Sequence, residues 1–142
     1  MTAKIKSRAI IMHENKIFLV RDTRCNKYFL PGGTHDEGES ITECLYREIK
    51  EELGIIPVID KLLCVREFFW QEWNLVIDFL FLVKNVKDFF EINKENCTHG
   101  HEWDDAWFFE IDKFSELDIY PTNLWEIIKN LTTNWQTILL ND

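Results

Sequence analysis

The sequence lacks both a long apolar run and a paired-cysteine motif. No stretch approaches the roughly 18 consecutive apolar residues that a membrane-spanning helix requires, and no such run follows the basic residues near Met1. The four cysteines, Cys25, Cys44, Cys64 and Cys97, form no CxxC pair, which argues against a zinc knuckle or a redox dithiol. We therefore expect a cytoplasmic protein with reduced thiols and no membrane association.

Positive charge is also scarce, because 16 Lys and Arg stand against 25 Asp and Glu, a formal net charge of −9. Non-specific binding to nucleic acid depends on Lys and Arg that neutralise phosphates, so a nucleic-acid partner is disfavoured. A small anionic substrate would need metal ions or a local group of basic residues.

The chain is instead rich in residues that can form a core. Apolar residues make up 46% of its 142 residues, with eleven Phe and six Trp, so the composition is not that of a disordered protein. The length fits one domain, and no repeat, linker or low-complexity tract divides it, so residues 1–142 are expected to form a single domain. The many aromatic residues, those at 68–73 especially, are compatible with a homodimer.

Runs rich in β-branched and aromatic residues predict the strands. The expected strands are 4–12, 16–22, 58–70, 74–83 and a short one within 102–110. The first two are expected to pair as a hairpin, and the next two as a longer hairpin. Pro31 and the two glycines after it are expected to end any strand before them and to begin a loop that runs to Glu39. A closing helix is expected within residues 121–134.

One helix is specified by local signals. Ser40-Ile-Thr-Glu43 is a capping box, in which the Ser40 hydroxyl accepts from the backbone of Glu43 and the Glu43 carboxylate reaches back to Ser40. The helix is therefore expected to begin at Ile41. Its apolar residues recur every four positions, and Gly54 stands where a left-handed C-terminal cap is needed.

Three carboxylates share one face of this helix. Glu48, Glu51 and Glu52 stand at i, i+3 and i+4, where like charges repel and weaken an isolated helix. The spacing alone is typical of a solvated acidic surface, but it also suits a hard cation such as Mg²⁺, which prefers carboxylate oxygens. Arg47 can pair with the glutamate four residues away on either side, and the glycines before the helix let a backbone carbonyl approach the same cation.

The segment Gly33–Ile55 resembles the signature of the Nudix family, written Gly-x5-Glu-x7-Arg-Glu-U-x-Glu-Glu-x-Gly-U, where U is a bulky aliphatic residue. Every fixed position matches, namely Gly33, Glu39, Arg47, Glu48, Glu51, Glu52 and Gly54, with Ile49 and Ile55 at the aliphatic positions. Leu-Pro-Gly-Gly precedes the box, as it often does in the family. Agreement at so many positions of fixed spacing makes a chance match remote.

The resemblance implies an α/β/α sandwich with a central mixed β-sheet, and hydrolysis of a nucleoside diphosphate linked to another moiety. It implies that Glu48, Glu51 and Glu52 bind Mg²⁺ or Mn²⁺, with the carbonyl oxygen of Gly33 as a further ligand. The residues that support the geometry of loop and helix are, by the same resemblance, Glu39 and Arg47.

The sequence does not decide which carboxylate is the general base, because family members use a glutamate either from the box or from a distant loop. Within the box we favour Glu48, and Glu52 counts with it as catalytic. Glu102 resembles the downstream glutamate that some members add as a ligand or base, although a surface carboxylate is an equal interpretation. The neighbouring His99 and His101 are expected to be exposed to solvent and not to bind a transition metal.

Other candidate contacts with the substrate lie outside the box. Four arginines fall on or near strands expected to border the cleft, although surface solubility explains each equally well: Arg8, Arg21, Arg24 and Arg66. Aromatic residues can stack a base but are more often core or interface residues, and the candidates are Tyr28, Phe68, Phe69, Trp70 and Trp73.

Residues outside the box also set substrate preference in this family. Enzymes that act on ADP-ribose often have a proline after the box, and those that act on diadenosine polyphosphates have a tyrosine near the same place. Residues 69–71 contain neither. Residues 20–25 do not resemble the signature of enzymes that act on coenzyme A. By elimination, a nucleoside triphosphate, an oxidised one included, or a small nucleotide sugar is favoured. Two alternatives stay open: a nucleotide-sensing module that keeps the fold without turnover, and an RNA-end pyrophosphohydrolase, which the acidity disfavours.

Overall fold

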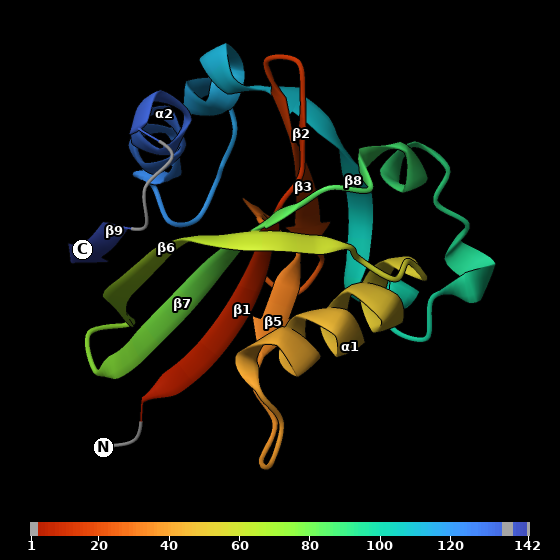
Figure 1. The fold of residues 1–142 in the computed structure, drawn as a ribbon, viewed down its shortest axis with the longest axis horizontal. Helices are drawn as coiled ribbons and strands as arrows, with labels where there is room; N and C mark the ends of the chain where they lie inside the picture. The colour runs from red at the N-terminus through yellow and green to blue at the C-terminus, as the bar shows by residue number, and fades with distance from the viewer. Residues whose placement is uncertain (1–2, 135–137, 142) are drawn as a thin grey trace.

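A computed structural model describes residues 3–134 and 138–141, and their side chains up to residue 131. The described residues form two β-sheets and two α-helices (Figure 1). The larger sheet has the spatial order β5 (Gly32–Thr34), β1 (Lys4–Ile10), β7 (Asn74–Val83), β6 (Ile59–Trp70) and β9 (Ile138–Asn141). The smaller sheet joins β2 (Met12–His13), β3 (Lys16–Asp22) and β4 (Lys27–Phe29), and β8 (Trp103–Glu110) pairs with β3.

The larger sheet is mixed and lies between the two helices, α1 (Ile41–Leu53) and α2 (Leu124–Asn134). In it β1 is parallel to β7 and antiparallel to β5, while β6 is antiparallel to β7 and parallel to β9. Figure 1 shows α1 and α2 well apart, with the larger sheet between them. The expected α/β/α sandwich with a central mixed sheet is therefore confirmed.

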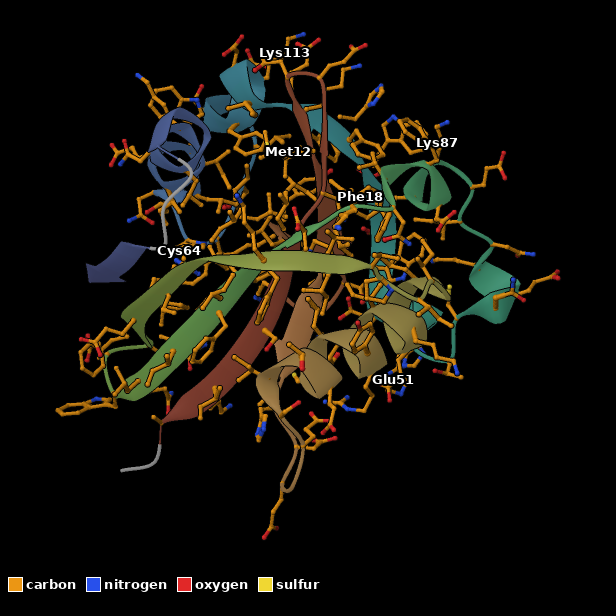
Figure 2. The ribbon with its side chains drawn as sticks, viewed as in Figure 1. Met12, Phe18, Glu51, Cys64, Lys87 and Lys113 are labelled. Atoms are coloured by element: carbon orange, nitrogen blue, oxygen red, sulfur yellow. The ribbon has the colours of Figure 1, made fainter. Side chains whose placement is uncertain are left out.

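Each helix covers its own hydrophobic core, because successive residues of a strand point to opposite faces of the sheet. The core under α1 includes Ala9, Ile11, Phe18, Leu45, Ile49, Leu53, Phe81 and Val83. The core under α2 includes Ile10, Leu19, Leu80, Phe114, Ile127, Ile128 and Leu131. Phe18 lies in the interior in Figure 2, whereas Lys87 and Lys113 project from the periphery.

The expected pairing of residues 4–12 with 16–22 is wrong over most of its length. Only the short strand β2 pairs with β3, and the amide of Phe18 donates to the carbonyl of Ile11 at 3.0 Å. Before that point β1 belongs to the larger sheet, where it pairs with β7 along all seven of its residues. Both faces of its second half are buried, and such a strand is stabilised best inside a sheet that is covered on both sides.

The loop after Pro31 begins later than expected, because Gly32–Thr34 is the edge strand β5. Gly32 has φ +142°, and a Cβ atom there would lie 2.0 Å from the carbonyl oxygen of Ser7 on β1. The close approach of the two backbones therefore requires glycine at this position. By contrast, the long hairpin of β6 and β7 and the strand β8 are confirmed.

Helix α1 begins and ends where the local signals predict. Both hydrogen bonds of the Ser40–Glu43 capping box are present, and Gly54 adopts the left-handed conformation with φ 70°. The expected closing helix is α2, followed by the strand β9, which the sequence did not indicate. The remaining connections contain four 3₁₀ segments: η1 (Val86–Phe90), η2 (Lys94–Asn96), η3 (Gly100–Glu102) and η4 (Ile111–Glu116). None of the helices in the described part of the chain has the length and apolar character needed to span a membrane.

Candidate active site

A cleft of about 680 Å³ crosses the larger sheet from β5 to β6. The hydroxyl of Ser7 donates to the carbonyl oxygen of Ile41 in α1, so Ser7 faces that helix. Because side chains alternate along a strand, Lys6 and Arg8 point to the opposite face, and both line the cleft. One end of the cleft is lined by glutamates of α1, and the other is lined by aromatic side chains.

Glu52 has a buried carboxylate oxygen at the α1 end. Its Oε2 atom is inaccessible to solvent and has no hydrogen-bond partner among the described residues. Burial, together with the nearby charge of Glu48, raises the pKa of Glu52 to about 8, although the charge of Arg8 opposes the shift. A buried acceptor without a donor is costly, so this position favours a cationic ligand or a proton.

Glu48 lies beside the backbone of Gly33. Burial raises its pKa, although hydrogen bonding to Arg47 opposes the shift. A Cβ atom at Gly33 would come within 2.3–2.6 Å of all three atoms of the Glu48 carboxyl group, so glycine leaves the space that the carboxylate fills. The two residues come from separate elements, β5 and α1, and meet at the edge of the larger sheet.

Arg47 connects the loop before α1 with two glutamates of the box. Its guanidinium donates to Glu39 at 2.7 Å, to Glu48 at 2.9 Å and to Glu51 at 3.2 Å. Hydrogen bonding from Arg47 lowers the pKa of Glu39 to about 2. Of the two pairings that the spacing allowed, the structure contains the one with Glu51, because Glu43 is used in the capping box.

No three His, Cys, Asp or Glu side chains converge as a preformed metal site within residues 3–131. Arg47 donates to Glu48 and Glu51, whereas Glu52 accepts from the backbone amide of Gly32. The donors nevertheless fit a hard cation, because all three are carboxylates on the cleft wall and one of them has an acceptor atom without a donor.

The loop before β8 packs against the C-terminal turn of α1. Nδ1 of His99 lies 3.2 Å from the Glu51 carboxylate, and the His99 amide donates to the Glu51 carbonyl at 2.8 Å. His101 is exposed as expected, whereas His99 is half-buried, lines the cleft and contacts the box. Sequence reasoning missed this role, because the contact depends on a fold that joins residues 48 positions apart.

Glu102 lines the cleft at the end of η3, in the loop that packs against α1. One of its carboxylate oxygens is 3.9 Å from Nη1 of Arg24. Asp22 in turn accepts from the same guanidinium at 2.7 and 3.0 Å. The candidate downstream carboxylate and a candidate phosphate contact are therefore adjacent.

Three of the four candidate arginines line the cleft, namely Arg8, Arg24 and Arg66. Arg21 is not among the lining residues, since it forms an ion pair with Asp104. Sequence reasoning missed Lys4 and Lys6, which also line the cleft and supply part of the local basic group that an anionic substrate needs.

The middle of the cleft contains a buried ion pair. Arg66 Nη2 lies 2.5 Å from Oδ2 of Asp78, and both side chains are almost completely buried. The same oxygen is 4.0 Å from Nε of Arg8, which also donates to the carbonyl of Leu30 at 2.9 Å. Asp78 therefore lies between two guanidinium groups on the floor of the cleft.

Comparison with known proteins agrees with this geometry. The family model of the NUDIX domain matches residues 4–131. A curated relative, the ADP-ribose pyrophosphatase of Methanocaldococcus jannaschii, is 46% identical over 61 residues. These residues cover 39% of this chain and 35% of the relative, so the chain matches about a third of that protein's length.

Solved structures share the fold at lower identity. The NUDIX hydrolase from Nitrosomonas europaea has a TM-score of 0.79 at 18% identity, over 96% of this chain and 93% of that one. An ADP-ribose pyrophosphatase from Streptococcus suis has a TM-score of 0.70 at 19% identity, over 99% and 100% of the two chains. The chain belongs to the Nudix family.

Proposed function

We propose that this enzyme hydrolyses the diphosphate linkage of a nucleoside diphosphate joined to another moiety, with Mg²⁺ or Mn²⁺ bound by Glu48, Glu51 and Glu52. The observation that carries the proposal is the state of Glu52, a buried carboxylate on the cleft wall with an acceptor atom that has no described donor. A divalent cation would satisfy that acceptor and would offset the cost of the buried charge. The carbonyl oxygen of Gly33, next to Glu48, is the proposed further ligand.

A bound divalent cation polarises phosphoryl oxygens and lowers the pKa of an attacking water. The residues of the chain would provide the positioning. Arg47 fixes the carboxylates of Glu48 and Glu51 through direct hydrogen bonds. Arg8, oriented by Leu30 and Asp78, is suited to hold a phosphate of the substrate in the middle of the cleft. Arg24, oriented by Asp22, also lines the cleft and is suited to the same role.

Two carboxylates remain candidates for the general base. Glu48 is close to the proposed metal position but is hydrogen-bonded to Arg47, which favours its charged form. The side chain of Glu102 lines the cleft and is 28% exposed, so water can reach it. Glu48→Gln and Glu102→Gln distinguish them, because loss of the base removes the acidic limb of the pH dependence of kcat, whereas loss of a ligand weakens metal binding.

The favoured substrates are a nucleoside triphosphate or a small nucleotide sugar. ADP-ribose joins them because the Methanocaldococcus jannaschii relative bears the name ADP-ribose pyrophosphatase, although the proline mark of such enzymes is absent at residues 69–71. A panel of nucleoside triphosphates, nucleotide sugars, ADP-ribose and dinucleoside polyphosphates, with identification of the products, would show which phosphorus is attacked.

The test of the site is Glu52→Gln, with Glu43→Gln on the same helix as its control. A glutamine at the third helical position still completes a capping box, so the control keeps the helix intact. We expect Glu52→Gln to abolish Mg²⁺-dependent hydrolysis and to weaken Mn²⁺ binding measured by electron paramagnetic resonance, while Glu43→Gln retains both. Equal rates for Glu52→Gln and the parent would overturn the assignment. Nucleotide binding by calorimetry without any product would instead identify a binding module.

A further inference from the structure

The end of the cleft away from α1 is lined by four aromatic rings. They are Phe29 on β4, Phe68 and Trp70 on β6, and Tyr120 in the connection between η4 and α2. Tyr120 contacts the other three, with distances between ring centroids of 4.4 Å to Trp70, 5.6 Å to Phe68 and 6.0 Å to Phe29. We call these four residues the aromatic group. It assembles segments that are up to 91 positions apart in the sequence.

The four rings differ in their access to a ligand. Phe68 is buried, and the guanidinium of Arg66 lies 4.4 Å from the centre of its ring. Phe29, Trp70 and Tyr120 are each half-buried and line the cleft, so part of every one of these rings can be reached. Asn74, the partner of Trp70 in the β6–β7 ladder, is exposed beside them. Its amide can both donate to and accept from the edge of a bound ring.

The distance between the aromatic group and the glutamates of α1 suits the length of a nucleotide. The cleft runs across β5, β1, β7 and β6, and three spacings between neighbouring strands amount to about 14 Å. This length is comparable with that of an extended nucleoside diphosphate. Arg8 lies between the two ends, with its guanidinium 5.4 Å from the Phe29 ring and its Nε 4.0 Å from Asp78.

We propose that Trp70 and Tyr120, with Phe29 beside them, form the subsite that stacks the nucleobase of the substrate. The inference rests on the proposed function, because it requires the diphosphate to lie at the α1 end. Every base has a π-face, and stacking on an aromatic side chain strengthens binding by roughly 5- to 150-fold. A sugar ring has no π-face, so stacking between rings favours the base over a sugar moiety at this end. The other moiety of the substrate then extends beyond the glutamates.

Tryptophan fluorescence tests the subsite without metal and without turnover. AMP is titrated against ribose 5-phosphate, which has the same phosphate and sugar but no base. We expect AMP to quench the fluorescence of the parent, and ribose 5-phosphate to leave it unchanged. In Trp70→Phe the quench is lost. The control is Trp73→Phe, because Trp73 is 75% exposed in the turn of the same hairpin and does not line the cleft, so this variant keeps the quench.

Steady-state kinetics give an independent measurement. With the best nucleotide of the substrate panel, Trp70→Leu is expected to raise KM about ten- to a hundredfold with little change in kcat, since stacking binds the ground state and the transition state alike. Far-UV circular dichroism checks that the variant is folded. A folded variant with unchanged KM, an AMP quench that persists in Trp70→Phe, or no AMP quench in the parent would each overturn the subsite.

The two proposals fail in different ways. If AMP quenches the fluorescence of Trp70 but no nucleotide is hydrolysed with Mg²⁺ or Mn²⁺, the base subsite stands and the proposed function fails. If nucleotides are hydrolysed and Trp70→Leu has no effect on KM, the proposed function stands and the base subsite fails.

Discussion

The indole nitrogen of Trp103 donates a hydrogen bond of 2.7 Å to the backbone carbonyl oxygen of Glu52. Trp103 begins β8, and its side chain is 9% exposed, so the hydrogen bond joins the smaller sheet to the last turn of α1 in a largely dry environment. That turn has carbonyl oxygens with no partner inside the helix, and Trp103 satisfies one of them. The buried carboxylate of the same glutamate is thereby held against the wall of the cleft.

Replacement of Trp103 by phenylalanine removes this donor and keeps a ring. We expect Trp103→Phe to lower the free energy of unfolding by about 1–3 kcal/mol, because the Glu52 carbonyl loses its partner, and to weaken Mn²⁺ binding as the last turn loosens. Urea denaturation and a metal titration measure the two effects. Trp107→Phe on the same strand is the control, since Trp107 is 47% exposed. Equal stability of the two variants would contradict the role of the hydrogen bond.

The two neighbouring glycines at the edge of the larger sheet should respond differently to alanine. In Gly33→Ala the three atoms nearest to the new methyl group all belong to the carboxyl group of Glu48, the flexible end of a side chain, so we expect the fold to be retained and the carboxylate to be displaced. We expect at least a tenfold loss of kcat/KM with a melting temperature close to that of the parent. In Gly32→Ala the methyl group meets the backbone of Ser7 and Arg8, which cannot give way.

Gly32→Ala is therefore expected to lower the melting temperature strongly, because the residue also has φ +142°. Differential scanning calorimetry and initial rates on both variants provide the comparison. A Gly33→Ala variant with full activity would show that the Glu48 carboxylate does not need this space.

Removing one partner of the buried ion pair of Arg66 and Asp78 should lower the stability of the protein strongly. We expect Asp78→Asn to lower the free energy of unfolding by about 3–5 kcal/mol, because a buried guanidinium loses its carboxylate. The double variant with Arg66→Met should recover part of that loss, because it also removes the buried guanidinium charge. A double-mutant cycle in urea measures the coupling.

The matched control for this cycle is the pair Arg21 and Asp104, whose side chains are 31% and 46% exposed. Exposed ion pairs contribute about 0–1 kcal/mol, so its coupling should be small. A coupling for Arg66 and Asp78 no larger than that of the exposed pair would show that burial does not strengthen the interaction.

Lys6 should make stability depend on pH in the alkaline range. Burial, and then the charge of Arg8, lowers its pKa from 10.5 to about 8. Between these two values the unfolded chain binds more protons than the folded chain, so the free energy of unfolding contributed by this group rises with pH from about 8 to about 10.5. Lys6→Met should lack that rise. Urea titrations near the two ends of this range measure it, with Lys87→Met as the exposed control; identical pH profiles for the Lys6 variant and the parent would contradict the shift.

Much of the site could be predicted from the sequence, because its signals are local. The capping box, the spacing of the three glutamates and Gly54 act within one helix, so α1 begins at Ile41 and ends before Gly54 as expected. The long hairpin followed for the same reason, since its strands are adjacent in sequence and alternate in character. The first hairpin was mostly wrong, because the pairing of β1 with β7 joins residues about seventy positions apart and is decided by which faces can be buried together.

The sequence by itself determined the family, the helix that carries the carboxylates, and the class of chemistry, since all three depend on residues within the 23 positions from Gly33 to Ile55. Only the tertiary structure decided that Arg8 enters the cleft while Arg21 does not, that His99 and Trp103 hold the end of α1, and that Tyr120 meets Trp70. These contacts join segments that are distant along the chain. Local propensity carries no information about them, because they form only when the two sheets and the loops between them pack together.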